Sequence, residues 1–397
     1  MRILIATSTF PLRPDDGVPR FVFDLAAALA RRDEVTVLAP AAPGIPARER
    51  WDGVEIRRFR YFWPERAQRL AYGDGMRENL AASRIARWQP PAFLLSQVAA
   101  LRRLLRNGAF DALNTHWLLP QGLAAALALR LGPRCRHVLS VHAGDVFLLE
   151  RLPFAGRLAR FTLNSCQTVF ADGSEVRERL LRLAKEPPGV EVRVQPMGID
   201  AERFGAPEPP PESPFPDGYL LLVGRLVEKK GARFLLEALP LVLPRHPGLG
   251  LIVIGTGPEE AALRRRVDEL GLGARVRFLG RRPHPEVRRH LQHCRAAVVP
   301  SVVDSRGEAD GMPTVVLEAM AAGARVVGSR IDGIPDIVRD GENGWLAAPG
   351  DRTDLARAIL AALAEPHPSA RAAEGRRTAA QHDWARVAER YREALHG

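Results

Sequence analysis

Cysteine is scarce in this chain of 397 residues, which contains only Cys135, Cys166 and Cys294. Cysteines so few and so widely spaced do not form a disulfide framework or a CxxC metal site. We therefore expect reduced thiols in the core of a cytoplasmic protein.

Long apolar runs are also missing. No uninterrupted apolar stretch reaches the roughly 18 residues of a membrane-spanning helix, so we expect no such helix. The first residues, MRILIATSTFPLRPDD, turn polar after a short apolar run, which predicts a first strand rather than a signal peptide. The composition, 46% hydrophobic and 26% charged, is that of a globular protein. At about 150 residues per domain, the length predicts two or three domains.

Lysine is nearly absent from a basic chain. It occurs only at positions 185, 229 and 230, although Lys and Arg together number 57 and the net charge is +11. That charge favours anionic partners such as phosphate esters, anionic lipid or nucleic acid. A solvated basic surface with no specific partner explains the same charge equally well. The basic residues are dispersed and match no nucleic-acid recognition motif, so we expect no nucleic-acid partner.

Strand-like and helix-like patterns alternate along the chain, and the strand-like runs are continuously apolar, as in parallel sheets covered on both faces. Residues 205–218 (GAPEPPPESPFPDG) interrupt the pattern with six prolines, which exclude a helix or a central strand. We expect an α/β protein with two doubly wound domains, 1–200 and 219–378, joined by a Pro-rich hinge over 201–218. The expected strands are 2–8, 34–40, 54–60, 110–116, 137–142, 168–171, 192–196, 219–223, 250–254, 275–279, 296–300, 325–328 and 344–347. The expected helices are 20–31, 77–106, 118–131, 174–183, 232–243, 259–270, 286–293, 314–322, 353–365 and 369–397.

The segment 298–328 (VVPSVVDSRGEADGMPTVVLEAMAAGARVVG) is the richest in candidate chemistry. Pro313 suits the first position of a helix. The backbone amides of Gly311, Met312, Thr314 and Val315 would then be free at a helix N-terminus, where phosphate binds well. Asp310 precedes this helix; it could be a simple N-cap.

Glu318 lies on the same helix, on an apolar face where an unpaired carboxylate is costly. It could be a surface residue, or a buried carboxylate that accepts hydrogen bonds from hydroxyl groups such as a ribose diol.

The segment 219–231 (YLLLVGRLVEKKG) places Arg225 directly after a buried strand, with Lys229 and Lys230 close behind. In a chain that uses arginine almost everywhere, a lysine indicates a need for a compact ammonium group. Arg225 and Lys230 could clamp a diphosphate opposite the amides of the helix N-terminus. A solvated loop is the alternative.

At this point the sequence becomes recognisable. VGRLVEKKG, VIGTGPE and DGMPTVVLEAMAAG resemble the nucleotide-sugar half of the family 4 glycosyltransferases of the GT-B fold. STFPLRPDDGVPRFVFDLAAALARRDEVTVLAP, THWLLPQG, SVHAGDVF, ADGSEVRERL and VQPMGIDAERF resemble the acceptor half, in the expected order. The resemblance implies two Rossmann-like domains facing a cleft, with a C-terminal helix over about 379–397 crossing back to the first domain.

The resemblance also implies roles for residues of the second half. Arg225 and Lys230 would bind the donor diphosphate and stabilise its departing charge. Glu318 would hold the ribose hydroxyls. Asp310 occupies a position where the family carries Glu and would contact the transferred sugar, unless Glu308 fills that role.

Further roles follow from the same resemblance. Gly255 matches a turn beside the nucleobase, and Arg281 would lie near the base edge. In the first half, Gly17 matches a glycine loop that usually carries two glycines, and His142 would contact the transferred sugar. The donor-binding set therefore includes Gly17, Gly255, Arg281, Asp310, Gly311, Met312, Pro313, Thr314, Val315 and Glu318.

The implied reaction moves a hexosyl unit, with retention of configuration, from a UDP- or GDP-linked sugar to a hydroxyl of a glycan or lipid-linked acceptor. Synthesis of cell-surface polysaccharide or glycolipid is the expected setting. The chain has no DxD motif, and two cations with a helix N-terminus would stabilise the leaving group, so we expect neither metal nor cofactor. A sugar-nucleotide 2-epimerase of the same fold is the alternative. A dinucleotide-dependent oxidoreductase is disfavoured because GTGPEE at 255–260 lacks the third glycine of GxGxxG.

Arginines and aromatic residues interleave over Arg57–Leu70 and Arg77–Arg106. Such a mixture suits an anionic membrane surface, where rings sit at headgroup depth and cations face the lipid. We therefore expect peripheral docking to the inner face of the cell membrane. In the alternative, the rings pack in the core and the arginine stems lie along the surface.

Overall fold

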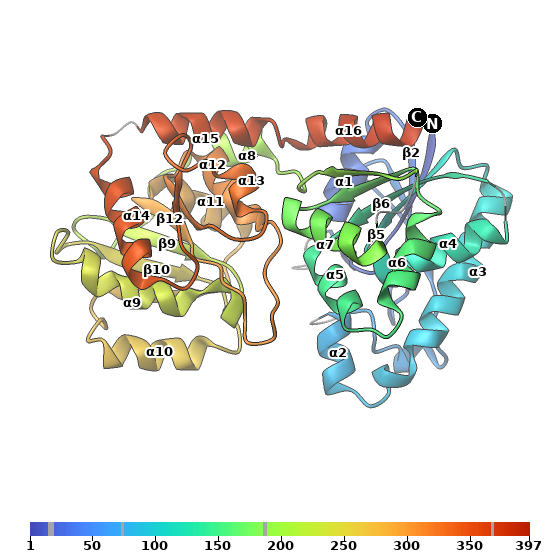
Figure 1. The fold of residues 1–397 in the computed structure, drawn as a ribbon, viewed down its shortest axis with the longest axis horizontal. Helices are drawn as coiled ribbons and strands as arrows, with labels where there is room; N and C mark the ends of the chain where they lie inside the picture. The colour runs from blue at the N-terminus through green and yellow to red at the C-terminus, as the bar shows by residue number, and fades with distance from the viewer. Residues whose placement is uncertain (15–19, 73–74, 133, 186–188, 367–368) are drawn as a thin grey trace. The chain divides into compact units, whose positions relative to one another are not determined.

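The computed structural model describes residues 1–14, 20–72, 75–132, 134–185, 189–366 and 369–397 (Figure 1). The backbone contacts divide the chain into two compact units. The first comprises Met1–Asp172, Val176–Gln195 and Trp384–Gly397, and the second comprises Gly173–Glu175 and Pro196–Asp383.

The first unit is built on an eight-stranded sheet of order β3-β4-β2-β1-β5-β6-β7-β8, parallel except for the edge strand β3, which runs antiparallel to β4. The strands are β1 (Arg2–Ala6), β2 (Glu34–Pro40), β3 (Arg48–Trp51), β4 (Val54–Phe59), β5 (Ala112–His116), β6 (Arg136–Val141), β7 (Thr168–Ala171) and β8 (Glu191–Val194). The sequence pattern did not predict β3, which carries charged residues at three of its four positions.

Helices cover both faces of this sheet (Figure 1). They are α1 (Phe21–Ala30), α2 (Met76–Ala82), α3 (Pro90–Gly108), α4 (Leu123–Arg130), α5 (Ala143–Glu150), α6 (Ala155–Leu163) and α7 (Ser174–Ala184), with short turns η1 (Glu65–Ala67), η2 (Ala86–Trp88) and η3 (Leu118–Gly122). The single helix expected over 77–106 is interrupted, because Pro90 and Pro91 begin a new helix.

The second unit contains a fully parallel sheet of order β11-β10-β9-β12-β13-β14. Its strands are β9 (Tyr219–Val223), β10 (Gly250–Ile254), β11 (Val276–Gly280), β12 (Ala296–Val299), β13 (Val326–Ser329) and β14 (Trp345–Ala347). Its helices are α8 (Ala201–Gly205), α9 (Ala232–Val242), α10 (Glu260–Glu269), α11 (His284–His293), α12 (Thr314–Ala322), α13 (Ile334–Ile337), α14 (Arg352–Ala364) and α15 (Ala370–Ala380), with the turn η4 (Glu228–Lys230).

Both faces of the second sheet are buried. Leu220 and Leu222 face a cluster with α9, α10 and α14, whereas Leu221 faces a second cluster with α11 and α12. Successive side chains of a strand point to opposite faces, so a continuously apolar strand serves both layers. Each buried leucine stabilises the fold by about 1.5–3 kcal/mol.

The C-terminal segment forms two helices rather than the one expected over 369–397. The second helix, α16 (Trp384–His396), packs against α1 in the first unit, so the expectation that the terminal helix returns to the first domain is confirmed. Tyr391 anchors it through a 2.8 Å hydrogen bond between its hydroxyl and Ser140 Oγ, and its ring lies 4.4 Å from that of Phe170.

The chain passes between the units at 172/173, 175/176, 195/196 and 383/384, and none of these points lies in the expected hinge over 201–218. The Pro-rich segment belongs to the second unit, because hydrogen bonds tie it to α11. Gln292 Nε2 donates to the carbonyls of Phe204 (2.8 Å) and Ala206 (2.7 Å), and the amide of Glu208 donates to Gln292 Oε1 (2.9 Å).

Candidate active site

The second sheet reverses its strand order between β9 and β12. In open parallel sheets, ligands bind at such a point, outside the carboxyl ends of the strands. The loops after β9 and β12 are joined here, because the amide of Val302 donates to the carbonyl of Lys229 (2.9 Å). Ser305 donates to Glu228 through both its amide (3.0 Å) and its hydroxyl (2.6 Å). The segments 219–231 and 298–328, which carry most of the candidate site residues, therefore lie next to each other.

Two glycines let these loops approach backbone to backbone. Gly231 has φ of +64°, and a Cβ added there would lie 1.8 Å from the carbonyl oxygen of Pro300. Gly255 has φ of +138°, and its Cβ would lie 1.8 Å from the carbonyl oxygen of Gly224. The amide of Gly255 also donates to the carbonyl of Gly280 (2.9 Å), which precedes the exposed Arg281. Gly255 and Arg281 thus lie at the same edge of the sheet as the lysine loop.

Asp310 and Lys230 form an ion pair across the two loops, with only 9% and 19% of their side chains exposed. Lys229 Nζ adds a 3.7 Å contact to Asp310 Oδ1 and donates to the carbonyl of Ala309 (3.2 Å). Burial raises the pKa of Asp310, but Lys230, Lys229 and the exposed Arg225 outweigh it and hold that pKa below its ordinary value. Asp310 is therefore ionised, and the lysine loop is not merely solvated. Of the two acidic candidates, Asp310 is the one that meets Lys230.

The N-terminus of α12 opens into the same region. Pro313 is the N-cap residue and not the first helical residue expected from the sequence, because its ψ of 118° is extended. Among the described residues, the backbone amides of Gly311, Met312, Thr314 and Val315 make no hydrogen bond. These donors and the helix dipole provide a positive site for a phosphate group.

Glu318 lies one turn further along α12 and is half-buried. Burial raises the pKa of its carboxyl to about 7, against the opposing effects of a hydrogen bond from Thr314 and the charge of Lys230. Hydroxyl donors from a ligand would favour the ionised form of this carboxyl, which accepts hydrogen bonds.

Asp332 is a site residue that the sequence analysis missed. Its Oδ2 accepts a 2.8 Å hydrogen bond from the amide of Asp310, and its φ of +52° places it in a left-handed turn. Burial, helped by Glu175 and Asp310, raises the pKa of Asp332 to about 7. No local motif distinguishes this residue, because its role depends on a loop after a different strand.

In the first unit, His142 follows β6, next to the point where the sheet reverses between β1 and β5. Its Nε2 is 3.3 Å from Nδ1 of the buried His116, and its Nδ1 is 3.7 Å from Asp172. The rings of Trp117 and Phe21 lie 5.0 and 5.3 Å from the His142 ring. His142 is thus one member of an aromatic cluster, whose other members the sequence analysis did not identify.

Asp145 fixes this cluster. Its carboxylate accepts hydrogen bonds from the amides of His142 (3.1 Å) and Leu118, which follow β6 and β5 respectively. Burial raises the pKa of Asp145 to about 7. The expected glycine-loop residue, Gly17, lies outside the described residues.

Comparison with known proteins agrees with this architecture. Residues 16–203 match the model of "Glycosyltransferase Family 4", and residues 217–365 match that of "Glycosyl transferases group 1". The chain is 29% identical over 381 residues to a GDP-mannose-dependent alpha-(1-6)-phosphatidylinositol monomannoside mannosyltransferase of Mycolicibacterium smegmatis, covering 93% of this chain and 91% of the relative. It is also 32% identical over 175 residues to the putative colanic acid biosynthesis glycosyltransferase WcaL of Escherichia coli, covering 44% of this chain and 42% of that protein.

Solved structures share the fold. Sucrose-phosphate synthase from Thermosynechococcus elongatus has a TM-score of 0.76 at 22% identity, covering 100% of this chain and 98% of that one. HepE from Anabaena, in complex with UDP, has a TM-score of 0.69 at 18% identity, covering 100% of both chains. The two matched domains, the full-length relative and the shared fold lead to one conclusion: this chain belongs to the family 4 glycosyltransferases of the GT-B fold.

Proposed function

We propose that this glycosyltransferase moves a hexosyl unit, with retention of configuration, from a nucleoside diphosphate sugar to a hydroxyl of a lipid-linked or glycan acceptor. The observation that carries the proposal is the convergence of Arg225, Lys230 and the free amides of α12 where the second sheet reverses. These groups supply positive charge from two sides, as a departing diphosphate requires.

Each group has a distinct role in the proposed reaction. Lys230 keeps one hydrogen bond to Asp310, and an ammonium group has three donors, so it can also bind a phosphate oxygen. The sugar–phosphate bond breaks while the acceptor oxygen bonds to the same face of the anomeric carbon. The proton of the acceptor hydroxyl passes to the leaving phosphate. Positive charge already in place stabilises that phosphate without further rearrangement.

The remaining expected residues would orient the donor. Glu318 accepts hydrogen bonds from the ribose hydroxyls, and Arg281 and Gly255 lie beside the base. His142 and Asp310 contact the transferred sugar. Neither a metal nor a cofactor is required, so we expect the same turnover before and after treatment with EDTA.

The donor we propose is GDP-mannose, because the relatives that match along almost the whole chain are named as GDP-mannose-dependent enzymes. Thermal-shift measurements with GDP-mannose and UDP-glucose test this choice. We expect GDP-mannose to raise the melting temperature more. A larger shift with UDP-glucose would contradict the choice of base but not the site.

Arg225→Ala tests the site itself. We expect this variant to lose the donor-induced shift, because it lacks one of the two side chains that bind the diphosphate. Arg245→Ala, which removes another exposed arginine of the same unit, is the matched control. A crystal structure with the nucleotide bound far from Arg225 and Lys230 would refute the proposal.

Product analysis by NMR tests the reaction. We expect the anomeric configuration of the donor in the product, and no change in the donor when acceptor is omitted. Conversion of donor alone would instead indicate the epimerase alternative, which the comparisons do not support.

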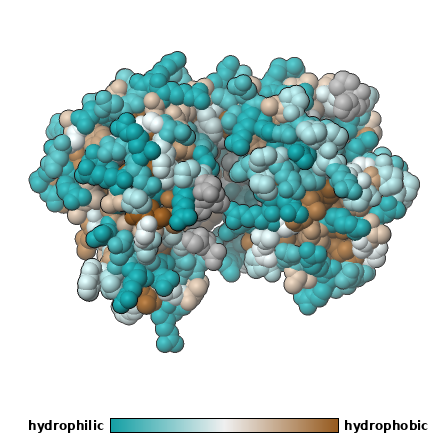
Figure 2. Space-filling model, turned by 180° about the vertical axis from the view of Figure 1, so that it is seen from behind, coloured by the Kyte–Doolittle hydropathy of each residue, from teal (hydrophilic) through white to brown (hydrophobic). Residues whose placement is uncertain are grey.

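The arginine and aromatic segments divide between core and surface. Phe59, Tyr61 and Phe93 are buried, with ring centroids of Tyr61 and Phe93 5.0 Å apart, so for these residues the core alternative is correct. Trp63 and Trp88, in contrast, are 85% and 82% exposed. Figure 2 shows a surface that is mainly hydrophilic, with hydrophobic side chains in small separate groups.

The two exposed tryptophans lie on connected segments. Gln89, next to Trp88, accepts from the amide of Arg69 (3.0 Å) and donates to the carbonyl of Ala67 (2.6 Å). Exposed arginines at 60, 66, 69, 84 and 87 flank them. We propose that this surface docks on anionic lipid, with the rings at headgroup depth. None of the helices among the described residues is both long and apolar enough to span a bilayer.

Vesicle flotation with phosphatidylglycerol tests docking. We expect the wild type to float at low salt and Trp63→Ser/Trp88→Ser to remain at the bottom. Leu131→Ser/Leu241→Ser, which removes two exposed apolar side chains elsewhere, is the control and should still float. A wild type that never floats would show that docking is wrong.

A further inference from the structure

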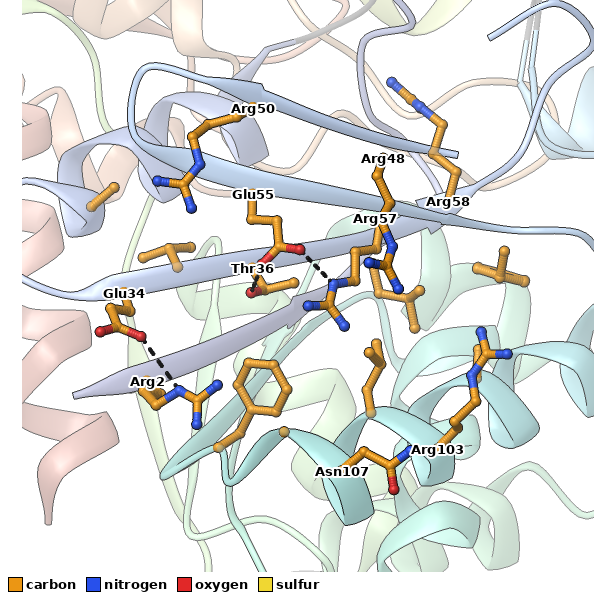
Figure 3. A pocket seen from close by; sticks show the side chains of 18 of the residues that line it. Arg2, Glu34, Thr36, Arg48, Arg50, Glu55, Arg57, Arg58, Arg103 and Asn107 are labelled. Atoms are coloured by element: carbon orange, nitrogen blue, oxygen red, sulfur yellow. Dashed lines mark hydrogen bonds and ion pairs between the residues drawn. The ribbon is translucent and has the colours of Figure 1, made fainter. Parts of the chain in front are cut away.

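The first unit contains a cavity of about 930 Å³ that the proposed transfer reaction does not use. It lies between α3 and the part of the sheet formed by β1, β2, β4 and β3. Figure 3 shows its arginines and acidic residues; Arg48, Arg50 and Arg57 extend from β3 and β4, and Arg103 and Asn107 come from α3. Its residues include Arg2 and Glu34, at the starts of β1 and β2, whereas His142 follows the carboxyl end of β6.

The strand register brings like charges together in this cavity. Arg48 lies directly opposite Arg57 in the antiparallel pair β3–β4, and Arg50 lies opposite Glu55. Like charges at directly opposed positions destabilise a sheet. Arg58, the next residue along β4, points to the opposite face, where its guanidinium is fully buried and bonds to Glu49 and to the carbonyl of Pro11. Arg58 is therefore structural, whereas Arg57 faces the cavity.

The acidic residues of the lining are already engaged. Glu55 bonds to Arg57 (2.7 Å), Glu34 pairs with Arg2 (3.4 Å), and Asp33 binds the N-terminal ammonium and Arg392 (both 2.9 Å). The pKa of Glu55 is lowered first by the hydrogen bond from Arg57 and, over a longer range, by Arg48.

Arg48, Arg50 and Arg103 then remain. Among the described residues, no hydrogen bond or ion pair within 4 Å engages their guanidinium groups. Within the described part of the chain, these three exposed side chains therefore form no ion pair, although the charge of Arg48 acts on Glu55 at longer range.

We propose that this cavity binds a small phosphorylated anion, of the size of a sugar phosphate or nucleotide. Three exposed guanidinium groups that line one open pocket match the oxygen atoms of phosphate groups, which arginine binds in a bidentate manner. The volume is within the range of small-ligand sites. A bound anion would also relieve the repulsion between Arg48 and Arg57. Because the site lies within the first unit, the ligand is not the donor diphosphate of the proposed reaction.

Titration calorimetry with inorganic tripolyphosphate tests the proposal on the full chain. The pocket variant is Arg48→Gln/Arg103→Gln. The control, Arg106→Gln/Arg245→Gln, removes the same charge and takes one residue from the same helix. We expect the pocket variant to weaken tripolyphosphate binding by roughly tenfold and the control by no more than about twofold. Equal weakening in both would indicate non-specific attraction and overturn the proposal.

Two further experiments distinguish this cavity from the donor site and from the proposed lipid-binding surface. In Arg225→Ala, binding that depends on Arg48 and Arg103 should persist, so failure of the donor site does not affect the result. Flotation on phosphatidylglycerol vesicles should be unchanged in the pocket variant. Loss of flotation without loss of tripolyphosphate binding would assign these arginines to lipid instead and refute a soluble ligand.

Thermal unfolding distinguishes a role of Arg48 in anion binding from a role in stabilising the fold. In low-salt buffer without polyanion, Arg48→Gln should raise the melting temperature, because it removes a like-charge pair. With tripolyphosphate the wild type should gain stability and the variant should not. A variant that melts lower than the wild type in both buffers would show that Arg48 is structural.

Discussion

At the scale of single residues, the site is defined by how charges are buried. Asp310 is almost fully buried yet ionised because lysines surround it, whereas Glu318, in a more apolar setting, has a pKa of about 7. Two carboxyls of the same segment therefore have different protonation behaviour. That difference suits one residue to hold a cation and the other to accept hydrogen bonds from hydroxyl groups.

Replacement of Lys230 by alanine should impair both activity and stability. The diphosphate loses one of its cations, so we expect kcat/KM to fall by roughly 100- to 1,000-fold. Asp310 loses its partner, so the free energy of unfolding at neutral pH should fall by on the order of 2–3 kcal/mol. Enzyme assays and urea unfolding measure the two effects.

Two variants make this prediction specific. Lys230→Ala/Asp310→Asn should regain most of the stability but no activity, because the unpaired charge is gone while the cation is still missing. Lys185→Ala, at an exposed lysine of the other unit, should behave as the wild type. Full activity in Lys230→Ala would contradict the assignment of Lys230.

The raised pKa of Glu318 predicts how donor affinity depends on pH. Below about pH 7 the carboxyl is increasingly protonated and accepts fewer hydrogen bonds, so the donor Kd should rise between pH 8 and pH 6. Glu318→Gln should bind more weakly at pH 8 and lose this dependence. Because Asp332 also has a pKa raised to about 7, Asp332→Asn is the control. If the dependence disappears only in Asp332→Asn, the role of Glu318 is wrong.

The same pKa shift affects stability with a defined sign. The folded state holds the Glu318 proton more tightly than the unfolded state, whose pKa is near 4.5. Its contribution is therefore fully present below pH 4.5 and is lost as the pH rises through about 7. We therefore compare the change in the free energy of unfolding that Glu318→Gln causes at the two pH values. This change should be more favourable at pH 8 than at pH 5, by about 1–2 kcal/mol. Urea unfolding at both pH values measures this difference.

At the scale of elements, parallel strands bring distant segments together at their carboxyl ends. Residues 224–231 and 300–318 are far apart in the sequence, but β9 and β12 are neighbours in the sheet. The approach is close enough that Gly231 has no room for a side chain. The position of Lys230 depends on this glycine as much as on the lysine itself.

Gly231→Ala should therefore be far more destabilising than the same change at Gly271. Both glycines have similar φ, +64° and +66°, but an added Cβ at Gly271 would meet nothing within 4 Å. We expect about 1 kcal/mol for Gly271→Ala, from backbone strain alone, and on the order of 3 kcal/mol or more for Gly231→Ala. Equal losses in urea unfolding would mean that the loops can separate without cost.

At the scale of the whole molecule, the C-terminal helix α16 completes the first unit although it is last in the chain. Tyr391 is fully buried and bonds to Ser140 on β6. Tyr391→Ala should destabilise the first unit by about 3–5 kcal/mol, and Tyr391→Phe by about 1 kcal/mol. Hydrogen exchange should show lost protection in α1 and β6, with β9 and β12 unchanged. Equal loss of protection in both units would contradict the assignment of Tyr391 to the first unit alone.

Much of the second unit could be predicted from the sequence. Its strands are buried on both faces, so their apolar runs are continuous, and turns rich in glycine and proline separate them. The elements of the first unit were harder to predict from the sequence. Strand β3 is polar at the sheet edge, and α5 carries only a weak amphipathic pattern, so local sequence did not mark them.

The sequence by itself determined the family and the alternating α/β architecture, and it supplied the charged residues that we propose for the donor site, because each is encoded in a contiguous motif. Only the tertiary structure decided that Asp310 pairs with Lys230, that Asp332 supports Asp310, and that Arg48 lies directly opposite Arg57 on neighbouring strands that line a cavity. The physical reason is that burial and charge pairing are properties of neighbours in space. Those neighbours come from strands whose order in a sheet differs from their order in the chain.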